Sequence, residues 1–301
     1  MIAAFDIGGT HIRAALSSEP GAIGPIRRVA TPTGNFGDFV ACLAELSEDA
    51  DRLAISVAGC CDPLTGRMKV ANIPCLDGRS AANDLSQALG RPVWIGNDAD
   101  CFALAEALQG SGRGHRSVFG VILGTGVGGG LVIDGKIITG AGGFAGEWGH
   151  GPVQDSRPLG RDVPRMACGC GQAGCLDAIG SARGIERLHR HLHGMDLSAR
   201  ALLELWQQDN AQATDTIAVW TEIMAGPLAM VLNVIGASIV PVGGGLAQVP
   251  ALVAALDAAV RARRLWQSPG ALLVPAEVPG EPGLIGATLA GWAMDGGAAP
   301  C

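Results

Sequence analysis

The chain has 301 residues, the size of one large domain or two medium ones, because a single hydrophobic core stops growing at about 250 to 300 residues. Lys and Arg number 21 against 28 Asp and Glu, so the net charge of −7 offers no basic surface to a nucleic-acid backbone. A hydrophobic content of 48% with 4% aromatic residues and 46 glycines favours an α/β enzyme over a disordered chain.

The sequence predicts a cytoplasmic protein with no membrane partner. No apolar run approaches the roughly 20 residues that a membrane span needs. The first residues carry no positive charge and meet an acid at Asp6, which is unlike a secretory signal. Nine cysteines, an odd number, are then expected as reduced thiols or metal ligands rather than as a disulfide framework.

The first third of the chain alternates strands and helices. Residues 2–7 form an apolar run that ends in a Gly-Gly-Thr turn, and residues 12–16 then alternate, which predicts a strand, a tight turn and a second strand. Asn97 and Asp98 lie where a later strand hands over to a helix, at the sheet edge where open α/β sheets bind ligands. In this part we also expect helices at residues 39–46 and 99–108 and strands at residues 53–57 and 93–95.

A glycine-rich run at residues 109–114 marks the boundary expected between two lobes. We place the N-terminal lobe at residues 1–116 and the C-terminal lobe at residues 117–283, with residues 284–301 packing back on the first lobe. The opening order of strand, glycine turn and strand recurs at residues 121–133, which indicates a duplicated fold. Later helices are expected at residues 185–193, 216–235, 249–263 and 284–294, and a later strand is expected at residues 239–242.

Three glycine-rich turns are candidates for nucleotide binding. At the first, backbone N–H groups and a Thr hydroxyl can hold phosphate, and Asp6 can hold Mg²⁺ through water. The second formally matches a dinucleotide fingerprint, but a hairpin follows where that fingerprint needs a helix, so we interpret it as a second phosphate-binding hairpin. The third can approach a nucleotide base; purely structural turns remain the alternative for all three. The candidate residues are Asp6, Gly8, Gly9, Thr10, Gly124, Thr125, Gly126, Gly243, Gly244 and Gly245.

His150, Cys168, Cys170 and Cys175 have the spacing of a metal site, and glycines between the cysteines let three thiolates turn onto one ion. A tetrahedral Cys₃His set is typical of a closed, structural zinc site. Three buried free thiols are the alternative, and they would leave the loop with little to order it.

Two carboxylates flank the expected metal ligands in the sequence. Glu147 lies three residues before His150, and Asp177 lies two residues after Cys175. A zinc site would bring both acids together, and carboxylates in a polar cleft accept hydrogen bonds from sugar hydroxyls. Solvated loop acids are the alternative.

Together these motifs resemble the ROK family of sugar kinases, within the actin-like, ribonuclease H-like ATPase superfamily, over nearly the whole chain. Residues 97–104 and 122–140 look closest to bacterial N-acetylglucosamine kinases, whereas residues 147–150 also occur in fructokinase-like relatives. The resemblance rests on Asp6-x-Gly8-Gly9-Thr10, Asn97-Asp98, Leu123-Gly124-Thr125-Gly126, Gly146-Glu147-x-Gly149-His150, the cysteine loop of residues 168–175 and Gly243-Gly244-Gly245.

The resemblance implies a duplicated, two-lobed α/β fold with an interlobe cleft, and phosphorylation of a hexose or N-acetylhexosamine at its 6-hydroxyl by ATP. N-acetyl-D-glucosamine is the favoured sugar. Asp98 would be the general base, and His150 would bind zinc with one ring nitrogen and sugar with the other. The implied cofactors are ATP, Mg²⁺ and a structural Zn²⁺, and a homodimer is expected. The implied substrate-binding residues are Gly59, Asn72, Asn97, Asp98, Glu147, His150 and Asp177.

Two kinds of alternative remain. The sugar can differ, since glucokinases, fructokinases and N-acetylmannosamine kinases share these motifs, and the family usually has Glu where this chain has Asp177. A non-catalytic sugar sensor is the other class. Repressors of the family carry a helix-turn-helix ahead of the first phosphate motif, which here begins at Asp6, and a sensor has no need of the base that Asp98 provides.

Overall fold

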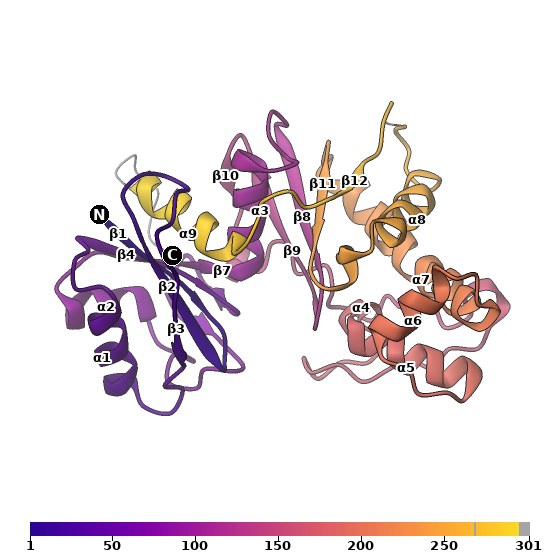
Figure 1. Ribbon diagram of the computed structural model, residues 1–301, viewed down its shortest axis with the longest axis horizontal. Helices are drawn as coiled ribbons and strands as arrows, with labels where there is room; N and C mark the ends of the chain where they lie inside the picture. The colour runs from indigo at the N-terminus through magenta and orange to yellow at the C-terminus, as the bar shows by residue number, and fades with distance from the viewer. Residues whose placement is uncertain (268, 295–301) are drawn as a thin grey trace. The chain divides into compact units, whose positions relative to one another are not determined.

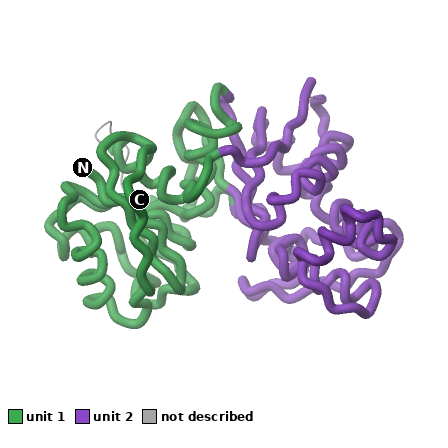
Figure 2. Tube along the Cα trace, viewed as in Figure 1, with its two compact units in different colours: residues 1–114, 130–146, 278–301 green, residues 115–129, 147–277 purple. Residues whose placement is uncertain are grey.

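The computed structural model describes residues 1–267 and 269–294, which fall into two compact units (Figure 2). Among the described residues, unit 1 comprises residues 1–114, 130–146 and 278–294, and unit 2 comprises residues 115–129 and 147–277. The chain first passes from unit 1 to unit 2 between residues 114 and 115, two residues before the boundary expected at 116/117. Residues 130–146, expected in the second lobe, instead belong to unit 1.

Close packing of Gly130 accounts for this difference. A Cβ on Gly130 would lie 2.5 Å from the Ala99 carbonyl oxygen, so the chain there runs against the backbone of helix α3 (Asp98–Gln109). Such an approach needs glycine, because any side chain would overlap the helix. The hairpin that follows is therefore carried by unit 1.

The sheet of unit 1 has the strand order β3-β2-β1-β4-β7. β1 pairs antiparallel with β2 and parallel with β4, and β4 pairs parallel with β7. Parallel strands covered on both faces are continuously apolar, which explains the run that opens the sequence. The strands are β1 (Ile2–Ile7), β2 (His11–Ser17), β3 (Arg27–Ala30), β4 (Arg52–Val57) and β7 (Val93–Asn97), with a separate pair β5 (Cys60–Cys61) and β6 (Met68–Lys69).

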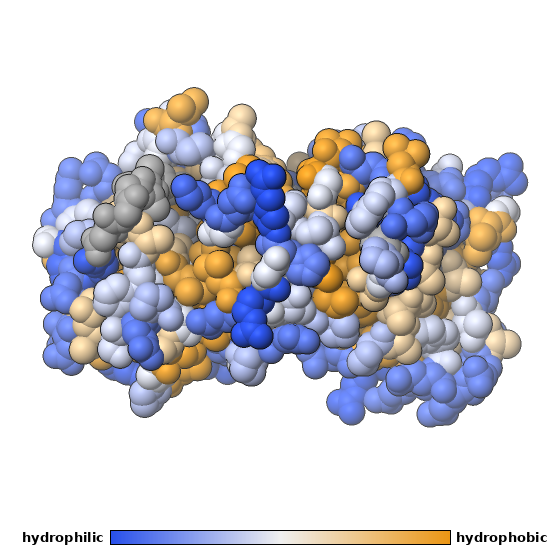
Figure 3. Space-filling view, turned by 90° about the horizontal axis from the view of Figure 1, so that it is seen from above, coloured by the Kyte–Doolittle hydropathy of each residue, from blue (hydrophilic) through white to orange (hydrophobic). Residues whose placement is uncertain are grey.

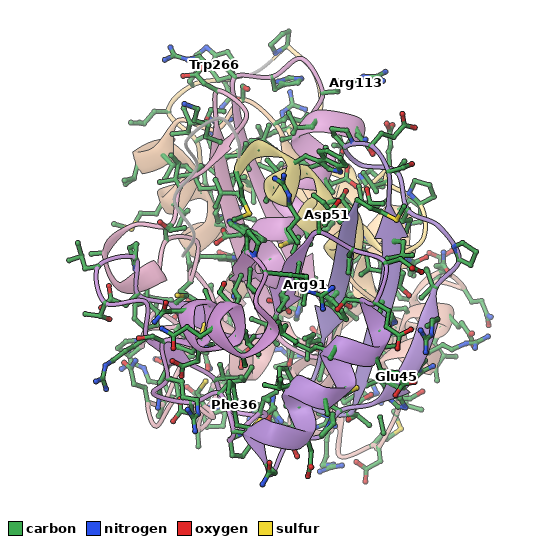
Figure 4. All side chains as sticks on the ribbon, turned by 90° about the vertical axis from the view of Figure 1, so that its left-hand side faces the viewer. Phe36, Glu45, Asp51, Arg91, Arg113 and Trp266 are labelled. Carbon is green, nitrogen blue, oxygen red and sulfur yellow. The ribbon has the colours of Figure 1, made fainter. Side chains whose placement is uncertain are left out.

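Helices cover both faces of this sheet (Figure 1). Phe5 packs in one core with side chains of α1 (Phe36–Leu46) and α2 (Ala81–Leu89), whereas Ala4 packs with Leu284 of α9 (Pro282–Ala293) on the opposite face. Arg91, labelled in Figure 4, lies just before the edge strand β7. It donates to the Ala50 carbonyl oxygen at 2.9 Å and so joins this segment to the chain that follows α1. Residues 295–301, expected with α9, lie outside the described residues.

The second sheet repeats the arrangement of the first, with the order β10-β9-β8-β11-β12. β9 pairs antiparallel with β10, while β11 pairs parallel with both β8 and β12. In both sheets the pair at one edge is antiparallel and the two pairs toward the other edge are parallel, which confirms the predicted duplication and the α/β class. The strands are β8 (Ser117–Leu123), β9 (Val127–Ile133), β10 (Lys136–Ile137), β11 (Val240–Gly243) and β12 (Leu273–Pro275).

The α-helices of unit 2 lie between residues 176 and 261. The longest, α7 (Ala211–Ile235), begins five residues before the predicted start because the Asn210 side chain accepts from the N–H groups of its first turn. Among the described residues it is the one helix long and apolar enough to cross a membrane. The buried residues of α7, Trp220 among them, pack within its own unit. On the side of the molecule drawn in Figure 3, hydrophilic and hydrophobic residues are mixed. The other helices are α4 (Leu176–Gly180), α5 (Ala182–His193), α6 (Ala199–Trp206) and α8 (Pro250–Arg261).

Candidate functional site

The junction of β7 and α3 holds the predicted base. Asn97 is the N-cap of α3: its Oδ1 accepts from the N–H groups of Ala99 at 2.8 Å and Asp100 at 3.2 Å. Its Nδ2 donates to the Gly59 carbonyl oxygen at 3.1 Å. Asp98 opens the helix half-buried, with Oδ1 accepting from the Ala99 N–H at 2.9 Å. The structure thus brings Asn97, Asp98 and Gly59 together. Both the oxygen and the nitrogen of the Asn97 side-chain amide form hydrogen bonds to the backbone.

The first glycine turn follows β1 in the same unit. Gly8 donates its N–H to the His11 carbonyl oxygen at 3.0 Å, which closes the turn, and the Thr10 side chain is exposed. A Cβ on Gly9 would lie 2.7 Å from the Asn72 Cβ. Asn72 therefore lies against the first glycine turn, and only a glycine permits that approach.

Asp6, near the end of β1, accepts hydrogen bonds from two polar side chains. Its Oδ1 accepts from the Ser56 hydroxyl at 3.1 Å and its Oδ2 from Arg13 Nη1 at 3.0 Å. Arg13 Nε lies 3.0 Å from Glu281 Oε1, so this guanidinium bridges two acids. Burial raises the pKa of Asp6, although Ser56 and Arg13 act to lower it. A partly buried carboxylate with a raised pKa is typical of a functional site.

Two glycine turns adjoin in unit 2. A Cβ on Gly124 would lie 3.8 Å from the Gly244 Cα, and Gly244 itself has φ +91°, with Leu123 backbone 2.4 Å from its Cβ position. Ile122 of β8 pairs with Gly243 of β11, so both turns follow the carboxyl ends of neighbouring parallel strands. The Thr125 side chain is exposed. The predicted phosphate and base motifs of this unit therefore meet at one sheet edge.

The four predicted metal ligands converge. One donor atom from each of His150, Cys168, Cys170 and Cys175 lies within 4.8 Å of the others. The Cys170 and Cys175 sulfurs are 3.6 Å apart, and the Cys168 sulfur is 3.6 Å from His150 Nδ1. Zn–S bonds of about 2.3 Å at tetrahedral angles place neighbouring sulfurs about 3.8 Å apart. The donor set therefore fits a tetrahedral zinc ion in both chemistry and size.

The thiols of this cluster differ in acidity. A hydrogen bond from the Gln172 backbone lowers the pKa of Cys170 to about 7. Burial, with further contributions from the neighbouring thiols of Cys170 and Cys175, raises the pKa of Cys168 to about 12. The three thiols do not all ionise unaided at neutral pH, so a cation that binds them displaces protons.

The acids beside the cluster have different surroundings. Glu147 Oε2 lies 3.6 Å from His150 Nε2, the ring nitrogen that points away from Cys168. A ligand histidine commonly donates its second N–H to a carboxylate, which fixes the ring. Asp177 Oδ1 accepts from the Val127 N–H at 2.8 Å. Asp177 thus contacts the second glycine turn, which its position in the sequence does not reveal.

Sequence reasoning missed several residues that shape these motifs. Arg13 and Ser56 contact Asp6, and Glu281 pairs with Arg13. Trp148 donates its indole N–H to the Gly128 carbonyl oxygen at 2.9 Å. The period-two pattern of the second strand marks Arg13 as pointing away from the apolar residues. No signal in the sequence links it to Glu281.

Comparisons with known proteins agree over the length of the chain. The ROK family matches residues 2–292. The N-acetylgalactosamine kinase of Shewanella sp. (strain ANA-3) is 36% identical over 300 residues, 97% of each chain. The N-acetyl-D-glucosamine kinase of Salmonella typhimurium (strain LT2) is 36% identical over 261 residues, 84% of this chain and 86% of the relative.

Solved structures give the same result. The ROK hexokinase of Thermus thermophilus superposes with a TM-score of 0.81 at 28% identity, covering 96% of each chain. A ROK family glucokinase of Streptomyces griseus, in complex with glucose and AMPPNP, superposes with a TM-score of 0.74 at 27% identity, covering 95% of this chain and 97% of the other.

Proposed function

This chain belongs to the ROK family, and on that premise we propose that it transfers the γ-phosphoryl group of ATP to the 6-hydroxyl of an N-acetylhexosamine. The two relatives at 36% identity, an N-acetylgalactosamine kinase and an N-acetyl-D-glucosamine kinase, support this substrate class. N-acetyl-D-glucosamine is the sugar that we favour. The observation that carries the proposal is the carboxylate of Asp98 at the β7–α3 junction.

Asp98 acts as the general base in the proposed reaction. The sugar O6 forms a bond to the γ-phosphorus, the bond from that phosphorus to the bridging oxygen breaks, and ADP leaves. The proton of the 6-hydroxyl passes to Asp98, since an alcohol must lose its proton as it attacks. The other requirement is positioning and charge stabilisation of the phosphoryl group.

The remaining candidate residues bind and orient. In unit 1, Gly8, Gly9 and Thr10 hold phosphate, while Gly59, Asn72 and Asn97 line the sugar pocket. Asp6 holds Mg²⁺ through water, and bound Mg²⁺ neutralises charge on the phosphates. In unit 2, the phosphate-binding residues are Gly124, Thr125 and Gly126, the base-binding residues are Gly243, Gly244 and Gly245, and the hydroxyl-binding residues are Glu147 and His150.

The cysteine loop holds a structural zinc ion in this proposal. His150, Cys168, Cys170 and Cys175 supply all four ligands, which leaves no open position for water or substrate. The sulfur separations given above support the assignment. Metal analysis of the purified protein is expected to find about one zinc per chain. Active protein without zinc, or a Cys170→Ser variant of unchanged stability without metal, contradicts it.

An ADP-release assay tests the activity. The sugars are N-acetylglucosamine, N-acetylgalactosamine, N-acetylmannosamine, glucose, fructose and mannose, with 6-deoxy-N-acetylglucosamine as the control that lacks the acceptor hydroxyl. We expect the highest kcat/KM with N-acetylglucosamine and no turnover of the 6-deoxy sugar.

Each other outcome has a defined meaning. A preference for glucose or fructose of more than about tenfold, or about 1.4 kcal/mol of transition-state binding, overturns the substrate assignment. Binding of sugars without ADP release with any of them supports the sensor instead. The cytoplasmic location and the homodimer stay predictions, the second testable by light scattering.

A further inference from the structure

We propose that Asp177 is a positioning residue that holds the second glycine turn, residues 124–126, in its phosphate-binding shape and connects this turn to the cysteine loop. The inference rests on the proposed function, because that function assigns the turn to the nucleotide phosphates. It gives Asp177 a role different from the sugar contact that the family resemblance implies.

The carboxylate of Asp177 is joined to the end of the turn. Its Oδ1 accepts from the N–H of Val127, the first residue of β9, at 2.8 Å. A Cβ on Gly126 would lie 2.7 Å from the same oxygen, so residue 126 has no side chain where the carboxylate approaches. The turn itself is closed by the Gly124 N–H, which donates to the Gly126 carbonyl oxygen at 3.0 Å.

The other side of Asp177 faces the cysteine loop. Its backbone N–H donates at 2.9 Å to the carbonyl oxygen of Gly149, the neighbour of the ligand His150. Its Oδ2 lies 3.7 Å from the sulfur of the ligand Cys168. Two residues before it, the ligand Cys175 is the N-cap residue of α4. Asp177 therefore contacts the ligand Cys168, lies two residues from the ligand Cys175, and is hydrogen-bonded to the residue before the ligand His150.

Neighbouring groups of the same two segments hold the turn from further points. Trp148 Nε1 donates to the Gly128 carbonyl oxygen at 2.9 Å, and the Ala182 N–H donates to the Gly124 carbonyl oxygen at 2.8 Å. A Cβ on Gly149 would lie 2.2 Å from the Val127 carbonyl oxygen. Trp148 and Gly149, next to the ligand His150, thus hold the main chain after the turn, and Ala182 of α5 holds the main chain before it.

This arrangement has a kinetic consequence. Backbone N–H groups that hold phosphate act best when they are fixed before the ligand arrives, because ordering them on binding costs free energy. Loss of the Asp177 carboxylate frees the Val127 N–H and loosens the turn. The effect falls on the nucleotide, whereas a residue that binds a sugar hydroxyl affects the sugar when it is removed.

The test uses the full-length, zinc-loaded protein with three variants. Asp177→Ala removes the acceptor, Asp177→Asn keeps an Oδ1 acceptor, and Trp148→Phe removes the neighbouring hydrogen bond but keeps an aromatic ring. Asp196→Ala is the control, because Asp196 is an exposed acid of the same unit paired with Arg190. Measurements are KM for ATP and for sugar, ADP binding by calorimetry without sugar, zinc content, and hydrogen exchange of residues 124–128.

Asp177→Ala is expected to raise KM for ATP and the Kd for ADP about tenfold, to change KM for sugar less than threefold, and to speed exchange of residues 124–128. Asp177→Asn is expected to restore most of both effects, Trp148→Phe to show a smaller effect of the same kind, and Asp196→Ala to show none. Removal of zinc by a chelator is expected to speed exchange of these residues in the wild-type protein.

Opposite results overturn the inference. A rise in KM for sugar with KM for ATP unchanged assigns Asp177 to the sugar, and unchanged exchange at residues 124–128 in Asp177→Ala removes the link to the turn. If Asp177→Ala does not fold, unchanged exchange and ADP affinity in Trp148→Phe have the same meaning. Failure of the proposed function is separate, since it appears as absent ADP release in the wild type, while exchange and zinc content still report on Asp177.

Discussion

Arg13 and Ser56 surround Asp6 with donors, but burial outweighs them in raising its pKa. The native state therefore binds this proton more tightly than the unfolded chain does. The contribution of Asp6 to stability falls as pH rises through its native pKa, and at neutral pH the charged group opposes folding. Such a cost is common where a site needs a charge that the fold does not favour.

Replacing Asp6 by Asn tests this trade-off. We expect Asp6→Asn to melt at pH 7 at the wild-type temperature or above, because the buried charge is gone and Arg13 keeps Glu281 as a partner. Turnover is expected to fall by about 10²-fold or more, since the acid that we propose to hold Mg²⁺ is lost. Thermal melts at pH 7 and pH 5, with ADP-release assays, check both parts. A large drop in melting temperature at pH 7 contradicts the argument.

Asp98 carries the second prediction at this scale. Asp98→Asn keeps the size of the side chain and an acceptor for the Ala99 N–H, but an amide cannot take the proton of the sugar hydroxyl. We expect kcat to fall by about 10²-fold or more while the Kd for sugar changes little. Steady-state kinetics and sugar titration measure the two quantities. Near-normal kcat in this variant rules Asp98 out as the base.

Among the elements, α3 and α9 show how glycine sets a distance between helices. A Cβ on Gly286 of α9 would lie 1.9 Å from the Cys101 carbonyl oxygen of α3. Because the contacted atom belongs to the backbone of α3, no side-chain rotation can relieve the overlap. Gly226, inside α7, has nothing within 4 Å of its Cβ position. The two helical glycines thus have opposite surroundings.

This contrast makes a matched pair of variants. Gly286→Ala is expected to lower the free energy of unfolding by about 1–3 kcal/mol, because the two helices must move apart. Gly226→Ala is expected to leave the free energy of unfolding unchanged or to raise it by up to about 1 kcal/mol, because alanine has a higher helix propensity than glycine. Crowding against Pro227 reduces this gain. Chemical denaturation measures both. Equal effects of the two substitutions contradict the role of close approach.

For the whole molecule, the main consequence is that unit 1 is built from three separate segments of chain. Its last segment includes α9, whose Leu284 is fully buried and packs with Ala4 and Ala15 of β1 and β2. One face of the first sheet is therefore covered by residues nearly the whole chain length away. The N-terminal segment lacks part of its own core until the last helix is present.

Truncation tests this dependence. A chain that ends at Glu277 is expected to lose the cooperative unfolding of unit 1 and to expose apolar surface to a hydrophobic dye. Leu284→Ala in the full chain is the graded control, with an expected loss of about 2–5 kcal/mol. Differential scanning calorimetry follows both proteins. An unchanged melting profile of the truncated chain contradicts the assignment of α9 to the core of unit 1.

Local sequence alone determined the elements and the chemistry-bearing turns of this protein. Strand, glycine turn and strand were predicted at both places where they occur, and the four side chains that converge as a candidate metal site were predicted from residue type and spacing. Asn97 was correctly placed at a strand-to-helix junction. These features depend on backbone preferences and on ligand chemistry within a few residues of chain, which the order of residues records directly.

Only the tertiary structure decided which distant groups meet. Asp177 contacts Val127 across 50 residues, Asn97 donates to the carbonyl oxygen of Gly59, and Arg13 joins Asp6 to Glu281. Residues 130–146 belong to unit 1 because Gly130 fits against α3. Each contact is set by the packing of whole elements, to which many residues contribute. No short stretch of sequence records it, because the same local pattern fits a turn facing solvent equally well.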